Sequence, residues 1–142
     1  MKENSSQQLH MLRYTLTEQL IHGMEVSNLA YDLARELGYE KEICYELAKA
    51  GVLHDIGKIT IDDKILNKPG KLTDEEFAIM KTHAAAGANM LRDLPIYQEK
   101  KSLVHVAYQI CRWHHERYDG RGYPDGLKGE DIPISAQVVA LA

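Results

Sequence analysis

Histidine is the residue type in this sequence that is best placed to do chemistry. The chain of 142 residues has seven histidines but only one Phe and one Trp. His54 is followed directly by Asp55, and further along the chain His114 and His115 are adjacent. Imidazole together with carboxylate is a ligand set typical of iron, manganese, zinc or nickel rather than of calcium or magnesium. These pairs therefore indicate a transition-metal site.

Two more histidines can join such a site. His22 and His83 lie in segments with a helical pattern, and Glu18 precedes His22 by four residues. Residues four apart share one helix face, although taken alone each of these would be an ordinary surface residue. A helical bundle can bring side chains from several helices to one point, as dimetal bundles do. We expect His10 and His105 to be ordinary histidines, because neither has a partner of this kind.

Other classes of function find little support in the sequence. Cys44 and Cys111 form no CxxC pair, which disfavours a thiolate zinc site and favours free, buried thiols in a reducing cytoplasm. No Gly-rich phosphate loop, nucleophile elbow or H-E-x-x-H motif is present. A net charge of −4 argues against binding of a nucleic-acid polymer. No apolar stretch approaches the roughly 18–20 residues of a membrane span.

The elements that must position the histidines are helices. Apolar residues step mostly by four from residue 9 to residue 37, and Gly38 follows as a helix stop. Thr73 and Glu76 form a capping box that opens a later helix. Predicted helices cover residues 9–37, 40–54, 73–93 and 99–117, and a fifth begins at residue 135. The only strand-like alternation is the short piece at residues 58–61.

The predicted architecture is therefore all-α, a bundle of about five helices with two long ordered loops at residues 55–72 and 118–133. Loops of this length in a compact domain are usually functional. Residues 1–8 are polar and are expected to form a flexible tail. Residues 9–142 are enough for one domain with its own core.

Two sequence motifs are recognisable. His54-Asp55-Ile56-Gly57-Lys58 resembles the signature of the HD superfamily of metal-dependent phosphohydrolases. The segment HHERYDGRGYP at residues 114–124 resembles the HHE…DGxGYP signature of the HD-GYP branch. DKILNKPGKL at residues 63–72 and GEDIP at residues 129–133 also resemble that branch. The resemblance covers roughly residues 18–142.

The resemblance implies an HD-domain helical bundle that hydrolyses the bacterial second messenger cyclic di-GMP to pGpG, GMP or both. It implies two or three divalent metal ions, with iron or manganese favoured and zinc, nickel or cobalt as alternatives. The residues that match metal ligands are Glu18, His22, His54, Asp55, His83, His114 and His115. Asp55 matches the carboxylate that bridges two metals, and Glu18 matches a ligand of a third. The residues that match the substrate side are Lys58, Arg121, Gly122, Tyr123 and Pro124.

This chemistry suits the residues. A phosphodiester is anionic and resists attack, and a two-metal site can bind its oxygens and generate a hydroxide nucleophile. Asp55 and Lys58 are the expected catalytic residues, because Lys58 can neutralise charge that develops on the phosphate. Tyr123 or Arg121 can stack on or bind a guanine.

Two alternatives stay open from the sequence: a weakly active or inactive module that binds metal or cyclic dinucleotide, and an HD phosphohydrolase for another nucleotide. The family pattern continues into an Asp that would directly follow Ala142. We therefore expect a truncated domain or a piece of a longer cytoplasmic signalling protein. A sensor or receiver domain elsewhere, or a homodimer, are the expected partners besides the substrate.

Overall fold

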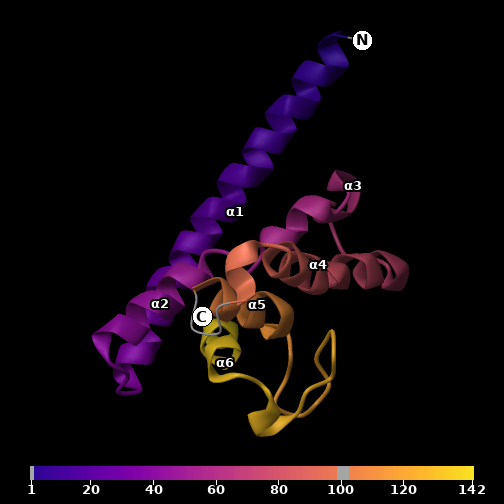
Figure 1. The fold of residues 1–142 in the computed structure, drawn as a ribbon. Helices are drawn as coiled ribbons and strands as arrows, with labels where there is room; N and C mark the ends of the chain where they lie inside the picture. Colours follow the sequence, from indigo (N-terminus) through magenta and orange to yellow (C-terminus); the bar gives the residue numbers. More distant parts are fainter. Residues whose placement is uncertain (1, 99–102) are drawn as a thin grey trace.

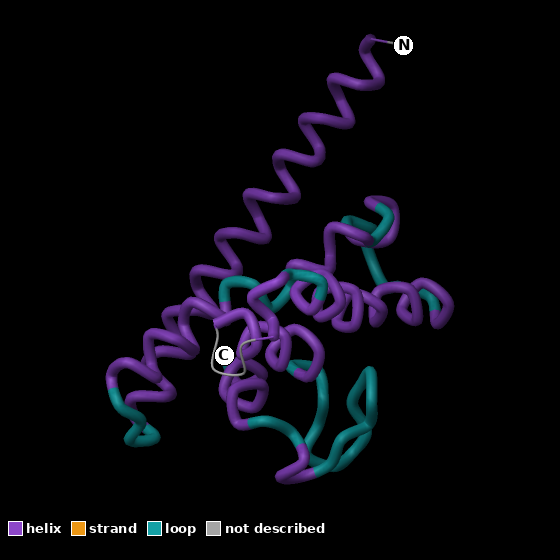
Figure 2. Tube along the Cα trace, viewed as in Figure 1, coloured by secondary structure: helices purple, strands orange, loops and turns teal. Residues whose placement is uncertain are grey.

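The computed structural model describes the backbone of residues 2–98 and 103–142, and within these ranges it contains helices, turns and loops but no strand (Figure 2). This confirms the predicted all-α class. The α-helices are α1 (Lys2–Glu36), α2 (Lys41–Gly51), α3 (Asp63–Leu66), α4 (Asp74–Arg92), α5 (Leu103–Trp113) and α6 (Ile134–Leu141). The short 3₁₀ helices are η1 (Ile56–Thr60), η2 (Pro95–Gln98) and η3 (Gly129–Asp131).

Helix α1 is long, and its N-terminal part projects away from the other helices (Figure 1). It begins at Lys2, so residues 2–8, for which we expected a flexible tail, are helical in the part that the structure describes. Lys, Glu and Gln are good helix formers, and adding turns to an existing helix costs little once it has nucleated. The predicted stop is confirmed: Gly38 has a left-handed φ of 88°, which glycine adopts without a steric penalty.

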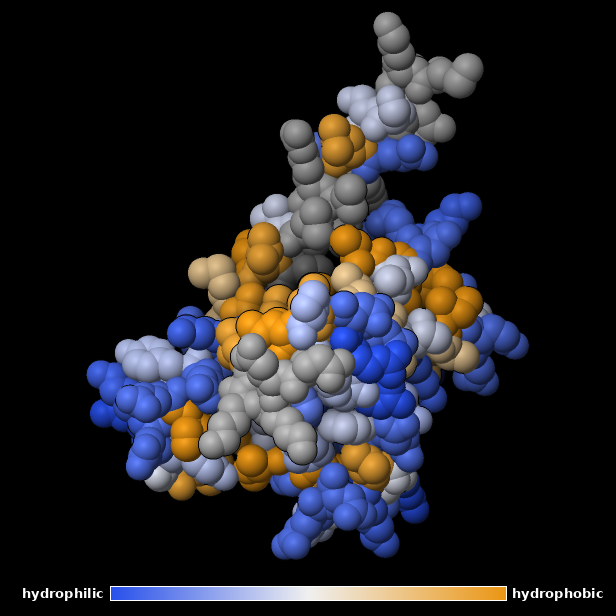
Figure 3. Space-filling model, in the orientation of Figure 1, coloured by the Kyte–Doolittle hydropathy of each residue, from blue (hydrophilic) through white to orange (hydrophobic). Residues whose placement is uncertain are grey.

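The backbone of α1 closely approaches the segment after α2 at Gly23. A Cβ at this position would lie 2.9 Å from the carbonyl oxygen of Val52, so the absence of a side chain allows the two backbones to approach. Around the junction of α1 with the other helices, Figure 3 shows apolar residues on the surface. Leu20, Ile21 and Met24 are exposed apolar side chains of this part of α1.

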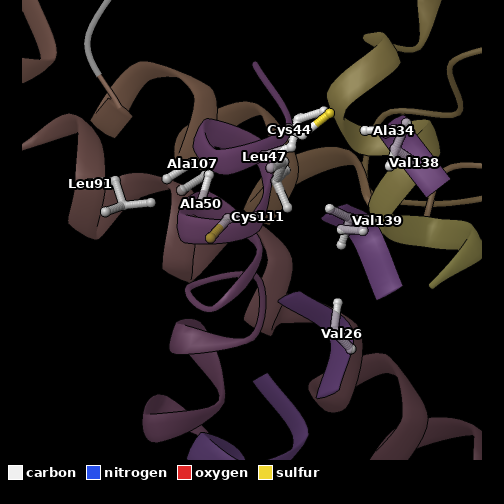
Figure 4. Close-up of a cluster of buried hydrophobic side chains, with 13 residues drawn as sticks. Val26, Ala34, Cys44, Leu47, Ala50, Leu91, Ala107, Cys111, Val138 and Val139 are labelled. Carbon is white, nitrogen blue, oxygen red and sulfur yellow. The ribbon is translucent and has the colours of Figure 1, made fainter. Parts of the chain in front are cut away.

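The core lies where α1, α2, α4, α5 and α6 meet (Figure 4). Five of its thirteen residues are alanines, which lets the helices pack closely. Its members are Val26, Ala30, Ala34, Cys44, Leu47, Ala50, Ala88, Leu91, Ala107, Ile110, Cys111, Val138 and Val139. Both cysteines are buried free thiols, as the sequence predicts. Figure 4 shows the α2 and α5 members at the centre of this cluster, with Val138 and Val139 of α6 at its edge.

Helix α4 matches its prediction closely. Glu76 N–H donates to Thr73 Oγ1 over 3.2 Å, and Thr73 N–H donates to Glu76 Oε2 over 3.0 Å, which completes the capping box. The helix ends at Arg92, and Asp93 is its C-cap. Helices 40–54 and 99–117 were predicted too long at their C-terminal ends, because α2 ends at Gly51 and α5 at Trp113. Residues 99–102, at the start of the latter, lie outside the described residues.

The segment predicted as an irregular loop at residues 55–72 contains two short helices, η1 and α3. The strand-like piece at residues 58–61 falls largely within η1 and is therefore wrong as a strand. After α2 the chain tightens into three-residue turns, in which His54 N–H bonds to Gly51 O and Lys58 N–H to Asp55 O. No helix among the described residues has the length and apolar character that a bilayer crossing requires.

Candidate metal centre

Asp55 occupies the position just before η1, and tight packing of η1 on α4 brings it to His83. A Cβ on Gly57 would lie 1.9 Å from the His83 carbonyl oxygen and 2.5 Å from Gly87 N. Only glycine at residue 57 therefore lets the two backbones come this close. The turn is also held from α5, because the Cys111 thiol donates to the Leu53 carbonyl oxygen over 2.9 Å.

The Asp55 carboxylate lies at the centre of the predicted histidines. Its Oδ1 is 3.1 Å from His83 Nε2 and 3.2 Å from His114 Nε2. Its Oδ2 is 2.9 Å from His54 Nε2 and 3.7 Å from His22 Nε2. One oxygen therefore faces α4 and the end of α5, and the other faces α1 and the turn after α2.

The ligand-type atoms form two groups that share Asp55. We call Asp55, His83, His114 and His115 the inner group, and Asp55, His22 and His54 the outer group; within each group one donor atom per residue lies within 4.8 Å of the others. Each is compact enough to hold one metal ion, with the shared carboxylate between the two positions. Five histidines and one carboxylate that the sequence singled out thus meet at one place.

The hydrogen bonds of the rings fix which nitrogen faces Asp55. The Nδ1 atoms of His54, His83 and His114 contact backbone carbonyl oxygens at 2.7, 2.6 and 2.9 Å. A carbonyl can only accept, so each Nδ1 carries the hydrogen and the neutral ring presents the lone pair of Nε2. Metal-bound histidines commonly have such a bond from the second nitrogen. Three pre-oriented lone pairs therefore point at the carboxylate.

The lone pairs of the histidine Nε2 atoms face those of the Asp55 carboxylate oxygens, so positive charge is required between them. Among the described residues, Asp55 Oδ1 and the Nε2 atoms of His83 and His114 are buried without a hydrogen-bond partner. Protons on the rings could supply the charge, but His114 and His115 lie only 4.0 Å apart between ring centres, and two imidazolium ions there would repel. Divalent metal ions supply the charge without that crowding, so the donor set fits them.

Where ring protons rather than a metal ion face Asp55, the carboxylate is still ionised. Burial alone would raise its pKa, but hydrogen bonds from His114, His54 and His83 outweigh burial and hold the pKa well below its usual range. Burial, with smaller contributions from His114 and His83, lowers the pKa of His115 to about 3. At neutral pH the site therefore offers an ionised carboxylate and a neutral His115, which are the protonation states of metal ligands.

Glu18 is placed differently from the other predicted ligands. It is exposed on α1, one turn before His22, and belongs to neither group. His22 itself is 52% exposed, whereas His83 and His114 are almost fully buried. His10 and His105, which we expected to be ordinary histidines, also lie outside both groups. His10 is exposed, and the centre of the His105 ring lies 5.2 Å from that of the Tyr97 ring.

On the predicted substrate side, Lys58 and Tyr123 are close to the centre. Lys58 Nζ lies 3.1 Å from Asp55 Oδ2. The Tyr123 ring stacks on His115 at 4.8 Å between centres. Burial, together with the charge of Asp55, raises the pKa of Tyr123 to about 12, so its hydroxyl remains a hydrogen-bond donor.

The rest of the predicted substrate loop is positioned by backbone contacts. A Cβ on Gly122 would lie 2.4 Å from both His115 O and Arg117 N, so glycine is required for the loop to pass this close. Arg121 and Pro124 are exposed. The structure thus places Gly122 and Tyr123 against the end of α5 and leaves Arg121 and Pro124 at the surface.

Sequence reasoning missed the role of Glu116. This carboxylate is buried and accepts backbone N–H bonds from three consecutive residues, Asp125 at 2.6 Å, Gly126 at 3.0 Å and Leu127 at 2.9 Å. Asp125 in turn accepts bonds from Arg112 and Trp113 at the end of α5. These contacts fasten the loop to the end of α5, directly before His114. The available signal was that Glu116 directly follows the histidine pair.

Comparison with known proteins supports the same interpretation of the motifs. The HD domain family model matches residues 3–142. The chain is 44% identical over 117 residues to the cyclic di-GMP phosphodiesterase response regulator RpfG of Xanthomonas campestris, a match that covers 82% of this chain and 30% of that protein. It is also 44% identical over 121 residues to a cyclic di-GMP phosphodiesterase of Thermotoga maritima, covering 85% of this chain and 32% of that protein.

A relative named for a different substrate is similar at nearly the same level. The chain is 40% identical over 121 residues to the 3'3'-cGAMP-specific phosphodiesterase 2 of Vibrio cholerae, which covers 85% of this chain and 22% of that protein. The chain spans about a third or less of the length of these three relatives.

Proposed function

Because the chain belongs to the HD domain family, we propose that it is a metal-dependent phosphodiesterase that hydrolyses cyclic di-GMP to pGpG, GMP or both. The observation that carries this proposal is the Asp55 carboxylate, which has histidine Nε2 atoms on both of its oxygens. A carboxylate shared between two compact donor groups is what a two-metal phosphodiesterase needs. Two relatives named as cyclic di-GMP phosphodiesterases support the substrate.

The inner group would hold one divalent ion and the outer group the other, with Asp55 bridging them. When bound, such a pair supplies Lewis acidity towards the phosphate oxygens and a hydroxide nucleophile at neutral pH. We propose iron or manganese, with zinc, nickel or cobalt as alternatives, because imidazole and carboxylate ligands accept all of these ions. Glu18, one turn from His22, is the residue proposed to hold a third ion.

The chain's own residues orient and neutralise the substrate. Lys58 lies within 3.1 Å of Asp55, so its ammonium group is positioned to offset negative charge that develops on a phosphate at the centre. Tyr123 keeps its proton and can donate a hydrogen bond from its place beside His115. Arg121 and Pro124, both exposed, are proposed to contact the nucleotide from the loop.

The test is product analysis. The chain is loaded with Mn²⁺ or, without oxygen, with Fe²⁺, then incubated with cyclic di-GMP, and the products are separated by chromatography. We expect pGpG or GMP to form, a chelator to stop the reaction, and Lys58→Ala to slow it by about 100-fold or more while keeping the bound metal. Binding of cyclic di-GMP without any product would contradict the proposal and identify a binding module instead.

A second candidate substrate is 3'3'-cGAMP, because the chain is 40% identical to the 3'3'-cGAMP-specific phosphodiesterase 2 of Vibrio cholerae. The same assay with both dinucleotides at equal concentration decides between them. We expect faster turnover of cyclic di-GMP, and a higher kcat/KM for 3'3'-cGAMP would reverse the assignment.

We also propose that this activity operates in the cytoplasm and is coupled to a sensor or receiver domain. Two buried thiols that remain unpaired suit a reducing compartment. One relative, of which this chain spans 30%, is named a response regulator.

A further inference from the structure

Two side chains of α4 that belong to no motif lie against the predicted substrate loop. Lys81 Nζ lies 4.8 Å from the centre of the Phe77 ring and 5.5 Å from the centre of the Tyr123 ring. The Phe77 and Tyr123 rings meet edge to face at 6.2 Å. We call Phe77, Lys81 and Tyr123 the lysine–aromatic wall. Since Tyr123 stacks on His115, this wall borders the inner group of the metal centre.

The charge of Lys81 is held in place without being neutralised. Aromatic faces attract an ammonium ion, most strongly where water is partly excluded, but they carry no net charge. Lys81 is half-buried and has no carboxylate partner among the residues that the structure describes. Lys58 differs, because it pairs with Asp55. Lys81 therefore presents an uncompensated positive charge beside the centre.

A cyclic dinucleotide needs such a charge away from the metals. It has two phosphodiesters, and only one of them can lie at the metal centre while it is cleaved. The other keeps its negative charge, and its partial desolvation is costly unless a cation meets it. One side chain, Tyr123, connects the His115 ring to Lys81, through contacts of 4.8 and 5.5 Å. Lys81 is therefore one side chain removed from the inner group, on the side of the loop that is expected to contact the nucleotide.

We propose that Lys81 binds the non-scissile phosphate of a cyclic dinucleotide, and that Phe77 positions its ammonium group. This inference rests on the proposed function, because it assumes a substrate with two phosphodiesters. It makes Lys81 a residue that selects dinucleotides over substrates with a single phosphodiester. Lys58 would act at the cleaved bond and Lys81 at the retained one.

The experiment measures binding separately from chemistry. Mn²⁺-loaded wild-type chain, Lys81→Met, Lys81→Arg and the control Lys49→Met are titrated with a hydrolysis-resistant phosphorothioate analogue of cyclic di-GMP. Met keeps the apolar stem but removes the charge, Arg keeps the charge, and Lys49 is an exposed residue of α2 outside the centre. We expect Kd to rise about 10-fold or more in Lys81→Met, as for loss of a charged hydrogen-bond partner. Lys81→Arg should stay within about 3-fold of the wild type, and Lys49→Met should not change.

A second substrate separates Lys81 from the metal centre. Bis(p-nitrophenyl) phosphate has one phosphodiester, so its hydrolysis and the bound metal should be the same in Lys81→Met and wild type. The proposal is overturned if the analogue binds both chains equally, if it binds neither, or if Lys81→Met loses metal. The proposed function has a separate test. If Lys81→Met binds the analogue more weakly than the wild type does, but the wild type releases no product from cyclic di-GMP, the role of Lys81 stands and the proposed activity is wrong.

Discussion

The two groups that share Asp55 are built from different kinds of surroundings. In the inner group, the side chains of His83 and His114 are 1% and 5% exposed, and their Nδ1 atoms bond to backbone carbonyls. In the outer group, His54 is held in the same way, but His22 is 52% exposed and lies 3.7 Å from Asp55. Lys58 Nζ is also 3.1 Å from the same carboxylate oxygen.

This difference predicts two metal positions of unequal strength. The inner position has two buried histidines and the half-buried His115, in a setting where electrostatic interactions are strong. The outer position has two histidines, of which His22 is about half exposed, and it shares its carboxylate oxygen with an ammonium group. We therefore expect the inner ion to bind more tightly and the outer ion to exchange first. One carboxylate would then serve two metal positions whose affinities differ with the burial and fixed orientation of the surrounding histidines.

The largest expected effect comes from removing the shared ligand. Asp55→Ala should lose both ions and all phosphodiesterase activity, because each group loses its only carboxylate. Elemental analysis of the purified variant measures this, with circular dichroism to show that the helices remain. His105→Ala is the matched control and should keep the wild-type metal content. Wild-type metal content in Asp55→Ala would show that the carboxylate does not bridge the two positions.

A smaller and asymmetric effect should separate the two groups. His83→Ala should weaken the tighter ion by more than the roughly 10- to 100-fold that loss of an outer-shell partner costs. His22→Ala should leave the tighter ion unchanged and weaken only the second. Titration of the metal-free chains with Mn²⁺, followed by calorimetry, resolves the two binding steps. If His22→Ala weakens the tighter step, the assignment of strong and weak positions is reversed.

The smallest expected effect belongs to Glu18. Glu18→Gln should lower the number of bound ions, because Glu18 is the residue proposed to hold a third one. It should leave the thermal unfolding midpoint of the metal-free chain unchanged, because the residue is exposed. Mass spectrometry under native conditions counts the ions for each chain. An unchanged count would make Glu18 an ordinary surface carboxylate and limit the centre to two ions.

The sequence was sufficient to predict those parts of the site that depend on residue type and local spacing. The histidine pairs, the Thr73 capping box and the stop at Gly38 are local signals, and the structure contains all of them. The functions of Gly57 and Glu116 depend instead on backbones that meet through the tertiary fold. A glycine has the same sequence signal whether it faces solvent or the carbonyl of His83, so this contact could not be predicted.

The boundaries of the elements were less predictable for a related reason. The ends of α2 and α5 are set by turns that carry His54 and His114 into the centre, and these turns override the helical pattern that continues in the sequence. At residues 2–8 the helix is instead longer than predicted, because a weak local preference for helix is enough to extend a helix that already exists.

The contact of Gly23 with Val52 gives α1 the mechanics of an unequal lever. At about 1.5 Å per residue, the arm from Lys2 to Gly23 is roughly 32 Å long, while His22 lies a single residue from the fulcrum. If the arm tilted about Gly23 so that Lys2 moved by about 5 Å, while the core residues Val26, Ala30 and Ala34 stayed in place, the His22 backbone would shift by only roughly 0.2 Å. Rotation about the helix axis is not reduced in this way and would turn the His22 side chain through the full angle. We therefore expect the outer group to respond more to rotation of α1 about its axis than to tilt of its N-terminal arm.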